Sequence, residues 1–598
     1  MRQNDTRHSL TLALMAVASM AGCGSAWAQI VPPGSAPPGA TEPQLPTREE
    51  IEKPGTPAPL SAPRVRVDQA KAFEPAPCAL STSPHRVAIN AVAFEGPGGS
   101  ALAPDIAEVL DGFAPLTQGE QPVANVCEMR DRASYLLRNS GYVASVQIRA
   151  QDLSGGVLHL LVVTAHITEI RVHGDAGKYR DLLDARIAQL QALDPLNQFD
   201  AERILLLIGD VPGMDVSLSL RSAGTTPGAV IGDLTLTTIP YNVMVNAQNY
   251  GSREVGPEAV YARTEIYGVT GHGDVTYLGL SSTLDPQEQQ IVQVGHAMSV
   301  GRSGAVIGGS FIAASSRPEL EGLDLRTRSS IAEVEFRMPL IRSMRHTVGI
   351  ATGLEVIEQK TRIHGTGPVA NLNLDKLSVA YARVQGEMRY PEVFFGGALQ
   401  GRAALELRKG TDLFDATAVP TNGPVASKDG FTPSRSEGNS QATVARFDAD
   451  ASIGLGRWVT LAGTVRGQWA DNPLLSYEEF SVGNLNIGRG YDPGANSGDS
   501  AIGLRGELRA SWPSNTPLNG EVFTFYDSVT VWNQDSGSTE NGRTLESWGG
   551  GLRVFLPGRL VFDLMYAQPL DKALSIDSEV PPGRVMFSLT TQFLPRPN

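Results

Sequence analysis

The C-terminal part of the sequence is dominated by a long segment in which apolar and polar residues alternate. From Tyr241 onward, helical periodicity is absent and the side chains repeat with a period of two, which is typical of a β-strand. In residues 445–455, for example, Phe447 shares one face with other apolar residues, whereas Arg446 and Asp448 lie on the opposite face. The segment therefore folds as strands with two chemically different faces, and this limits the possible folds more than any other feature.

A soluble β-sandwich also alternates, but three features favour a transmembrane β-barrel. The strands run to about 10 residues, the length expected of tilted strands that cross a bilayer. Their non-apolar faces carry full charges, which a water-filled lumen accommodates and a dry sandwich core does not. With roughly 22 residues for each strand and its turn, residues 241–598 provide an antiparallel barrel of about 16 strands. The same alternation recurs in residues 502–512, 560–566 and 585–593.

The N-terminus has the features of an export signal. Two arginines precede an apolar stretch over residues 10–21, and an Ala-Trp-Ala motif ends at Ala28. We therefore predict that residues 1–28 are a signal peptide and that the mature chain begins at Gln29.

The three cysteines are informative for an exported chain. The sequence Met-Ala-Gly-Cys at Cys23 approaches a lipoprotein signal, which is an alternative to simple cleavage; both alternatives send the chain out of the cytoplasm. If Cys23 is removed with the signal, Cys78 and Cys127 remain, and two cysteines in an oxidising compartment predict one disulfide. The alternative is a pair of buried free thiols.

Composition and motifs argue against several functional classes. The net charge is −14, whereas nucleic-acid binding usually requires a basic face. The sequence has no nucleophile motif, metalloprotease motif or phosphate-binding loop, so we expect neither catalytic residues nor a cofactor. His159, His166 and His173 are seven residues apart but have no matching cysteine or carboxylate group, so we expect no metal site.

The composition of residues 29–84 predicts a proline-rich periplasmic tail or linker. Ten prolines fall between Val31 and Pro63, a density that favours extended polyproline conformations and leaves too little apolar surface for a core. Thr47 could cap a short helix, which Pro54 would end.

Residues 85–238 contain two copies of one small α/β unit, which we assign to residues 85–164 and 165–238. Each copy reads as a strand, two helices and two strands, and the segments VAFEG and IRVHG occupy equivalent places. The helices are expected at 105–113, 126–139, 179–193 and 200–209, and the strands at 86–96, 143–150, 156–163, 166–174, 214–221 and 230–238. Two copies form tandem domains rather than a solenoid.

Several segments share motifs with one family. The Gly141-Tyr142 step follows the second helix of the first α/β unit, and NYGSREVGPEAVYA (249–262) opens the alternating segment. The most specific motif is FSVGNLNIGRGYDPG (480–494), which is followed by the F-x-D motif of VFTFYDSVTVW (522–532). On these motifs the chain resembles the TpsB transporters of two-partner secretion, outer-membrane pores that export haemolysins and filamentous haemagglutinins. The resemblance covers roughly residues 86–598 and implies an α+β tandem of periplasmic POTRA domains followed by a transmembrane antiparallel β-barrel.

The resemblance assigns roles to individual residues. Four residues would form the tip of a loop that folds back into the lumen: Gly488, Arg489, Gly490 and Tyr491. Phe525 and Asp527 would form the docking site of this tip on the inner wall. The chemistry is suitable, because flanking glycines allow tight turns and an arginine offers a carboxylate a planar fork of donors. Phe525 would add a flat face beside the guanidinium. The alternative is an ordinary exposed hairpin turn.

The resemblance also implies a function and partners. The chain would be a pore in the cell outer membrane of a Gram-negative bacterium, with residues 29–238 in the periplasm. It would recognise an unfolded adhesin- or haemolysin-like exoprotein and translocate it without nucleotide hydrolysis. Outer-membrane lipid and the barrel assembly machinery would be further partners.

Three other functions remain open at this stage: an assembly factor for other outer-membrane proteins, a passive porin, and a periplasmic binding module on an inert anchor. The last would leave the loop at residues 480–494 unexplained. The N-terminal plug helix of the family has no convincing counterpart here. Thr47–Lys53 is too short for it, so we expect a different plug or none.

Overall fold

The computed structural model describes residues 46–53, 67–68, 77–224, 226–320, 323–365, 367–393, 396–420, 429–483, 487–512, 518–536 and 538–595. The predicted signal peptide, its cleavage site at Ala28 and Gln29, and Cys23 lie outside the described residues, as does most of the segment 29–84. None of the helices within the described ranges is long and apolar enough to cross a bilayer.

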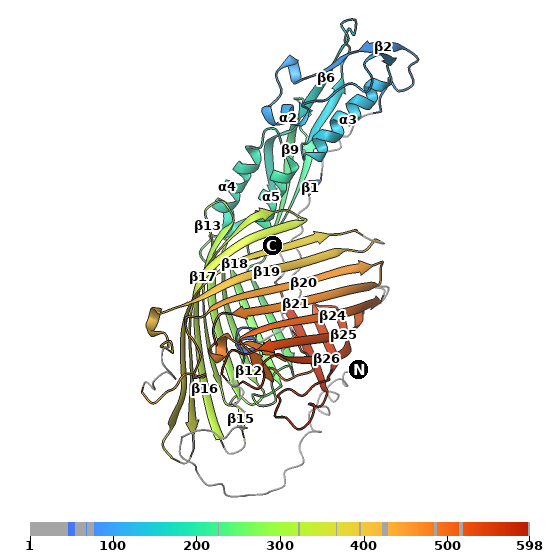
Figure 1. Cartoon of the computed structure of the whole chain (residues 1–598). Coiled ribbons are helices and arrows are strands. Elements are labelled where there is room, and N and C mark those ends of the chain that lie inside the picture. Colours follow the sequence, from blue (N-terminus) through green and yellow to red (C-terminus); the bar gives the residue numbers. More distant parts are fainter. Residues whose placement is uncertain are drawn as a thin grey trace, which may run out of the picture. The chain divides into compact units, whose positions relative to one another are not determined.

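Two α/β domains precede the alternating segment (Figure 1). The first domain comprises β2 (Arg86–Ile89), β3 (Ala91–Glu95), η2 (Pro97–Gly99), α2 (Pro104–Val109), β4 (Gly119–Pro122), α3 (Asn125–Asn139), β5 (Ala144–Ile148) and β6 (Val157–Thr164). The second comprises β7 (His166–His173), η3 (Gly177–Tyr179), α4 (Arg180–Gln191), α5 (Gln198–Gly209), β8 (Met214–Ser222) and β9 (Ala229–Thr238). Two short elements lie before them, α1 (Arg48–Glu52) and β1 (Val67–Asp68).

Both domains pair their strands in the same way. The first strand runs parallel to the last, and the middle strand runs antiparallel to the last, which gives the orders β3-β6-β5 and β7-β9-β8. In the second domain, Leu183 of α4 and Leu205 of α5 are buried with Leu218 and Leu234 of the sheet. The internal repeat of the sequence is therefore a repeat of strand pairing and helix packing.

The first domain differs in detail from the expected pattern. Its first strand is divided at Asn90, whose backbone N–H donates to the carbonyl of Gly156 rather than continuing a single ladder. The strand β2 then pairs with β4, a short strand that the periodicity did not predict. The helix α2 ends at Val109, earlier than expected, and Gly112 adopts a positive φ shortly after it.

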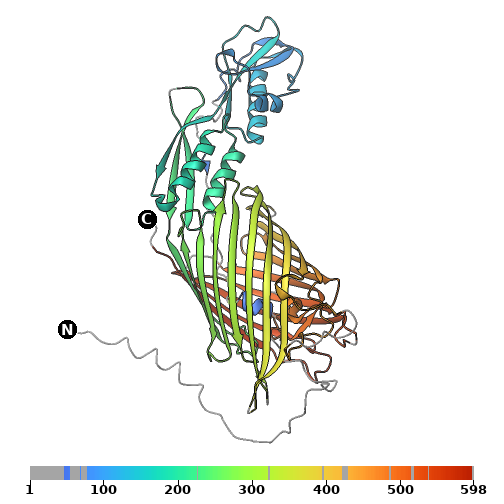
Figure 2. The same ribbon diagram turned by 90° about the vertical axis from the view of Figure 1, so that its left-hand side faces the viewer.

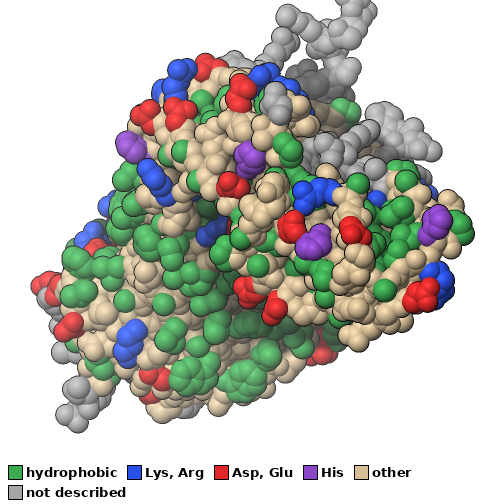
Figure 3. All heavy atoms as spheres, turned by 90° about the horizontal axis from the view of Figure 1, so that it is seen from above, with side chains coloured by type: hydrophobic (Ala, Val, Ile, Leu, Met, Phe, Trp, Pro, Cys, Tyr) green, Lys and Arg blue, Asp and Glu red, His purple; other side chains and the backbone are tan. Residues whose placement is uncertain are grey.

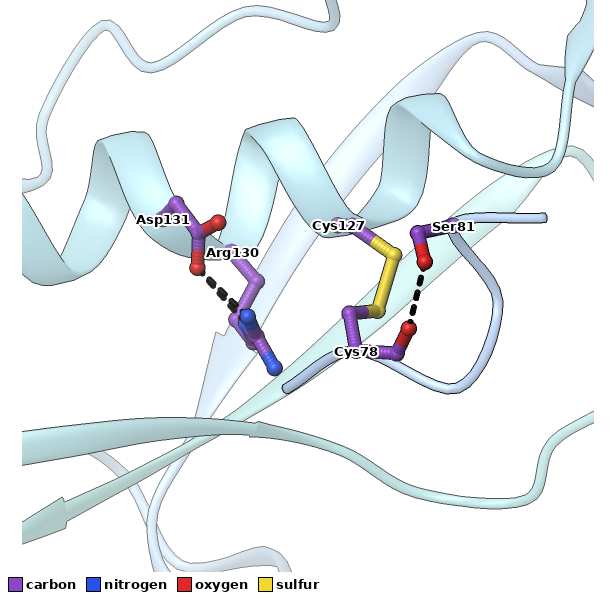
Figure 4. The surroundings of a disulfide bond; sticks show 5 residues. All are labelled: Cys78, Ser81, Cys127, Arg130 and Asp131. Atoms are coloured by element: carbon purple, nitrogen blue, oxygen red, sulfur yellow. Dashed lines mark hydrogen bonds and ion pairs between the residues drawn. A yellow bond between two sulfur atoms is a disulfide. The ribbon is translucent and has the colours of Figure 1, made fainter. Parts of the chain in front are cut away.

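A disulfide joins Cys78 to Cys127 (Figure 4). It ties the segment before β2 to the first turn of α3, and the two Cα atoms are 5.9 Å apart. Cys127 is buried beside the core of the first domain. Because the bridge closes a loop with a sequence separation of 49 residues, it removes conformational freedom mainly from the unfolded first domain.

The alternating segment closes into one antiparallel barrel (Figures 1 and 2). Within the described residues, sixteen strands form the ring, and the two-residue β15 is paired beside β16. The ring closes where β10 pairs with β28, and Asn246 donates there to the hydroxyl groups of Ser588 and Thr590. The strands are β10 (Tyr241–Gln248), β11 (Ala259–Tyr267), β12 (Val275–Thr283), β13 (Gln289–Val300), β14 (Ala305–Ser316), β15 (Glu319–Leu320), β16 (Leu323–Arg342), β17 (His346–His364), β18 (Ala370–Tyr390), β19 (Leu399–Thr411), β20 (Thr443–Leu455), β21 (Val459–Ala470), β24 (Ser500–Trp512), β25 (Asn519–Trp532), β26 (Arg543–Leu556), β27 (Leu560–Pro569) and β28 (Arg584–Phe593). The prediction of about 16 strands is confirmed.

The faces of the strands are arranged as the alternation predicted. Ile502, Leu504 and Leu508 on β24 are 44–50% exposed on the outer surface, whereas the intervening Glu507 is buried inside. The expected length of about 10 residues is wrong for three strands, because β16, β17 and β18 have 20, 19 and 21 residues. They extend beyond the neighbouring strands at one end of the barrel (Figures 1 and 2). Polar and charged side chains replace the apolar ones there, so the period of two continues after the membrane-facing surface has ended.

Charged side chains of both signs are interspersed on the face shown in Figure 3. In the second domain, Arg221 Nε lies 2.8 Å from Asp233 Oδ2, and hydrogen bonds from Arg221 and His173 lower the pKa of the Asp233 carboxyl. Exposed pairs of this kind are screened by water and stabilise the fold little. Hydrophobic burial therefore holds these domains together.

Replacing both bridging cysteines, in the variant C78S/C127S, should destabilise the first domain by about 2–4 kcal/mol, because its unfolded state regains the freedom that the closed loop had removed. Hydrogen exchange of the full chain measures this as faster exchange in peptides from residues 77–164. Peptides from the second domain serve as the internal control. Equal exchange of the first domain in the variant and the parent would contradict the structure.

Candidate functional site in the barrel lumen

The loop between β21 and β24 folds back and packs on the inner wall of the barrel. A short hairpin forms its base, in which β22 (Phe480–Val482) pairs with β23 (Asn496–Gly498). Beyond the hairpin, Ile487 and Tyr491 are buried with Val529 of the wall strand β25. The loop is therefore a packed part of the interior, and the alternative of an exposed turn is wrong.

The tip of the loop requires its two glycines for different reasons. Gly488 has a φ of 74°, a backbone conformation that residues with a Cβ atom rarely adopt. A Cβ on Gly490 would lie 2.7 Å from Cβ of Ser547 and 2.9 Å from the backbone N of Pro569. The backbone thus approaches strands β26 and β27 so closely that only glycine fits at Gly490.

Arg489 at the tip contacts the predicted docking residues. Its guanidinium carbon is 3.4 Å from the ring centroid of Phe525, and its Nη2 is 3.5 Å from Oδ1 of Asp527. The backbone N–H groups of Gly488 and Arg489 donate to Asp527 Oδ2 at 3.0 and 3.1 Å. Arg489 and Asp527 are 6% and 0% exposed, so this is a buried ionic contact and not a surface pair.

Two further partners of the tip were not assigned from the sequence. The shortest ion pair of Arg489 is with Glu507, at 2.9 Å between Nη1 and Oε2. Arg505 Nε lies 2.9 Å from Asp527 Oδ1 and shares this carboxylate with the loop tip. The alternation had placed Arg505 and Glu507 on the polar face of their strand, which is a signal for a lumen position but not for a particular partner.

Tyr491 fixes the other side of the tip. Its hydroxyl lies 2.8 Å from the carbonyl oxygen of Glu546 and 3.1 Å from the backbone N of Asp571. The carbonyl of Tyr491 accepts a 2.8 Å hydrogen bond from Arg584 Nη1 on β28. The four predicted tip residues are therefore held by strands β25, β26 and β28 and by the segment after β27.

The helix α1 lies inside the barrel, a position that the sequence did not predict for Thr47–Lys53 (Figure 2). Thr47 and Glu50 form a reciprocal capping box, which allows a five-residue helix to form. Ile51 is fully buried against wall residues, and Gln293 Nε2 donates to its carbonyl at 3.1 Å. Contacts with the wall stabilise a helix that is too short to be stable alone.

An ionic cluster attaches α1 to the wall and to the base of the loop. Arg48 Nη2 lies 2.9 Å from Glu355 of β17, and Nη1 lies 3.0 Å from Glu478, which precedes β22. Arg408 of β19 contacts the same two carboxylates at 2.5 and 2.7 Å. In the sequence, Glu355 lies 307 residues from Arg48 and Glu478 lies 430 residues from it. No local pattern could therefore have predicted the cluster.

Another buried arginine joins three loops beside this cluster. Arg435, in the segment between β19 and β20, has Nη1 2.8 Å from Glu479 and 2.5 Å from Asp499, and it also pairs with Asp535. Asp499 accepts further hydrogen bonds from the backbone N–H groups of Leu474 and Gln534, both at 2.7 Å. No local pattern in the sequence pointed to this contact between separate loops.

The remaining lumen is a polar cavity of about 1350 Å³. Its wall carries charges of both signs, among them Arg48, Glu355, Arg408, Arg489 and Glu507. A cavity lined by charged side chains suits an extended polypeptide, because the polypeptide's backbone groups need hydrogen-bond partners along the way. In this conformation, the loop and α1 occupy part of that passage.

Comparisons with known proteins agree with this geometry. The family model for haemolysin secretion/activation proteins ShlB/FhaC/HecB matches residues 235–554, more than half of the chain. The heme/hemopexin transporter protein HuxB of Haemophilus influenzae (strain 86-028NP) is 22% identical over 476 residues, which cover 76% of this chain and 78% of that protein. The outer membrane transporter CdiB of Dickeya dadantii is 21% identical over 443 residues, or 72% and 74% of the two chains.

Two solved structures share the fold. CdiB from Escherichia coli superposes with a TM-score of 0.67 at 16% identity, over 91% of this chain and 95% of that one. CdiB from Acinetobacter baumannii gives a TM-score of 0.62 at 17% identity, over 85% and 90%. At this identity the likeness concerns the fold, namely α/β domains followed by a closed barrel.

The variant R489A should release the loop tip while the barrel stays closed. It removes one partner from two buried carboxylates. Because Arg509 and Arg505 remain paired with these carboxylates, we expect a cost below the about 3–5 kcal/mol of an uncompensated buried charge. Faster hydrogen exchange of the peptide that spans residues 487–498 measures the effect. The matched control is R466A, another lumen arginine, which pairs with Asp448 and Asp450 and makes no described contact with the loop. If both variants exchange alike at the tip, Arg489 is not the anchor.

The variant R48A should weaken the docking of α1. Because Arg408 keeps Glu355 and Glu478 paired, the loss of these contacts costs about 1–3 kcal/mol, which raises the ratio of undocked to docked helix by roughly 5- to 100-fold. Conductance of the purified protein in planar lipid bilayers should therefore rise. The control is K53A, an exposed residue with no ion pair among the described residues. Equal conductance of R48A and K53A would show that α1 does not close the passage.

Proposed function

The chain belongs to the ShlB/FhaC/HecB family of haemolysin secretion/activation proteins, outer-membrane transporters of two-partner secretion, and we propose that it carries an unfolded exoprotein through its own barrel. It is located in the outer membrane of a Gram-negative bacterium. The relatives are transporters and not enzymes, which agrees with the lack of a catalytic motif in the sequence.

The observation that supports this mechanism best is the anchored loop inside the lumen. Arg489 holds the loop through Glu507 and Asp527, and Arg505 already contacts Asp527. If Arg489 leaves, these carboxylates keep Arg509 and Arg505 as partners, which reduces the cost of moving the loop. We infer that the loop and α1 move aside to admit the exoprotein and close the passage again afterwards.

The periplasmic part would receive the exoprotein. We propose that residues 29–84 form a tail, in which α1 lies in the lumen and not in the periplasm as the sequence had suggested, and that residues 85–164 and 165–238 form two POTRA domains. Within the described residues, β5 and β7 each pair on one side only, so their free edges could accept an extended segment by β-augmentation. The second edge of β8 is occupied by β1, which leaves fewer free edges in the second domain.

The driving force must come from outside the chain. The sequence has no phosphate-binding loop, so folding of the exoprotein at the cell surface would make transport irreversible. We propose an adhesin- or haemolysin-like exoprotein as the cargo. Outer-membrane lipid would surround the barrel, and the barrel assembly machinery would insert it.

Two other functions explain less of the molecule. An assembly factor for other outer-membrane proteins would use a similar loop, but the chain has two periplasmic α/β units rather than a longer series. A passive porin would account for the barrel and leave residues 85–238 without a role.

A strain that lacks the gene should lose one large protein from its culture medium. The intact gene should restore it, whereas a copy without residues 85–238 should not, because the cargo would have no periplasmic binding site. The parallel control is the abundance of other outer-membrane barrels. An unchanged medium with depleted barrels would favour the assembly factor, and no change in either, when the gene is expressed, would favour the porin.

A further inference from the structure

Two pairs of basic residues lie directly opposite each other on the neighbouring strands β16 and β17. Arg326 is in register with Arg362, and Arg328 is in register with Lys360. Like charges placed directly opposite on one face of an antiparallel pair repel each other and destabilise the pair. Four cations in this arrangement are therefore unfavourable unless an anion lies between them.

These four side chains point away from the lumen. On β16, Leu325, Thr327 and Ser329 are buried, and the alternate residues Arg326 and Arg328 are exposed. Thr327 also hydrogen-bonds to the buried Thr361 of β17 at 3.0 Å, which identifies the inner face. The basic residues consequently share the outer face with the lipid-facing side chains.

The basic residues begin where the apolar outer surface ends. Along β16, Phe336 and Val334 are 37% and 59% exposed on the outer face, and the same face then continues to Arg328 and Arg326. On β17, Val356 stands opposite Ala332 on that face, four register positions from the pair of Lys360 and Arg328. Between them on this face, Ser330 stands opposite Glu358, whose carboxylate lies 4.0 Å from Lys376. The cluster therefore lies at a boundary between hydrocarbon and water.

This boundary belongs to the outer leaflet. At the other end of β16, Arg342 Nε lies 2.8 Å from Oδ2 of Asp210 in the second α/β domain, which is periplasmic. The end that carries Arg326 and Arg328 is consequently the cell-surface end. In a Gram-negative outer membrane, the lipid of that leaflet is lipopolysaccharide, whose lipid A bears phosphate groups.

Neighbouring carboxylates neutralise only part of the cluster. Arg326 pairs with Asp324 at 3.0 Å, but Arg317 binds the same carboxylate at 2.7 Å. Arg328, Lys360 and Arg362 have no carboxylate partner in the described part of the chain. Lys360 Nζ instead lies 4.4 Å from the ring centroid of Phe431, and Nε of Arg362 is buried without a partner.

We propose that Arg326, Arg328, Lys360 and Arg362 bind the phosphorylated head group of lipid A. Arginine forks bind phosphate oxygens in a bidentate way, and residues in cross-strand register are about 5 Å apart, so one phosphate can contact both members of a pair. The acyl chains would lie on the apolar groove below. This groove of about 980 Å³ is lined by Leu278, Val294, Phe311, Val334, Leu354 and Val356.

The proposal does not depend on the transport mechanism, because none of the four residues lines the passage. It predicts a lipid that is held at one position beside the long strands β16 and β17. Such a lipid would offset the repulsion between the two basic pairs and stabilise the part of the barrel that extends beyond the neighbouring strands.

Purified full-length protein, titrated with deep-rough lipopolysaccharide and with the same lipid after removal of its phosphates, tests the proposal. The variant R328Q/K360Q/R362Q should bind the phosphorylated lipid at least about tenfold more weakly, and it should bind the dephosphorylated lipid as the parent does. The control R345Q/R457Q/R559Q removes the same charge from exposed arginines in the turns at the periplasmic end and should bind as the parent does.

Other variants and probes keep the test decisive. R328Q alone changes one exposed side chain, so it should fold normally and lose about threefold in affinity. Inorganic phosphate should not displace the lipid, because it lacks the acyl chains that fill the groove. Equal binding by the triple variant and the control would overturn the proposal, as would equal affinity of the parent for the two lipids or displacement by inorganic phosphate.

Discussion

The interior of this barrel is organised by arginine side chains that are buried among carboxylates. Arg489 crosses from the re-entrant loop to Glu507 and Asp527 on the wall, and its guanidinium lies on Phe525. A buried pair of this kind adds little net stability, because desolvation of both charges opposes their attraction. It does determine position, because the guanidinium meets these carboxylates and Phe525 only when the loop tip lies against β24 and β25. The ion pairs of Arg489 therefore determine where the loop lies, and hydrophobic burial is not the only interaction that holds it.

The same principle repeats at two other points in the lumen. Arg48 places the short helix α1 between Glu355 and Glu478, and Arg435 joins the segment between β19 and β20 to Asp499. In the first of these clusters, a wall arginine, Arg408, already contacts the same carboxylates. A carboxylate with two cationic partners can lose one and remain paired. This arrangement lowers the cost of displacing Arg48 or Arg489 from its carboxylates.

Much of the fold follows from local patterns. The period of two after Tyr241 determines that one face of each strand meets lipid and the other meets water, and Ile502 and Glu507 lie as this pattern requires. The repeat in residues 85–238 appears as the same strand pairing in both domains. The loop tip around Arg489 was found because its glycines and its F-x-D partner strand are recognisable motifs. The lengths of β16, β17 and β18 were missed, because charged residues beyond the membrane surface keep the same alternation.

The sequence by itself determined the class of protein, an exported chain with two α/β units and a barrel, because hydrophobic periodicity and motif spacing are local properties. It also determined which arginine stands at the tip of the loop. Only the tertiary structure decided which carboxylates form ion pairs with Arg489, Arg48 and Arg435. It also placed Thr47–Lys53 inside the lumen. The reason is physical: these contacts join residues that are up to 430 positions apart, and they exist only when the closed ring of strands brings the opposite walls together.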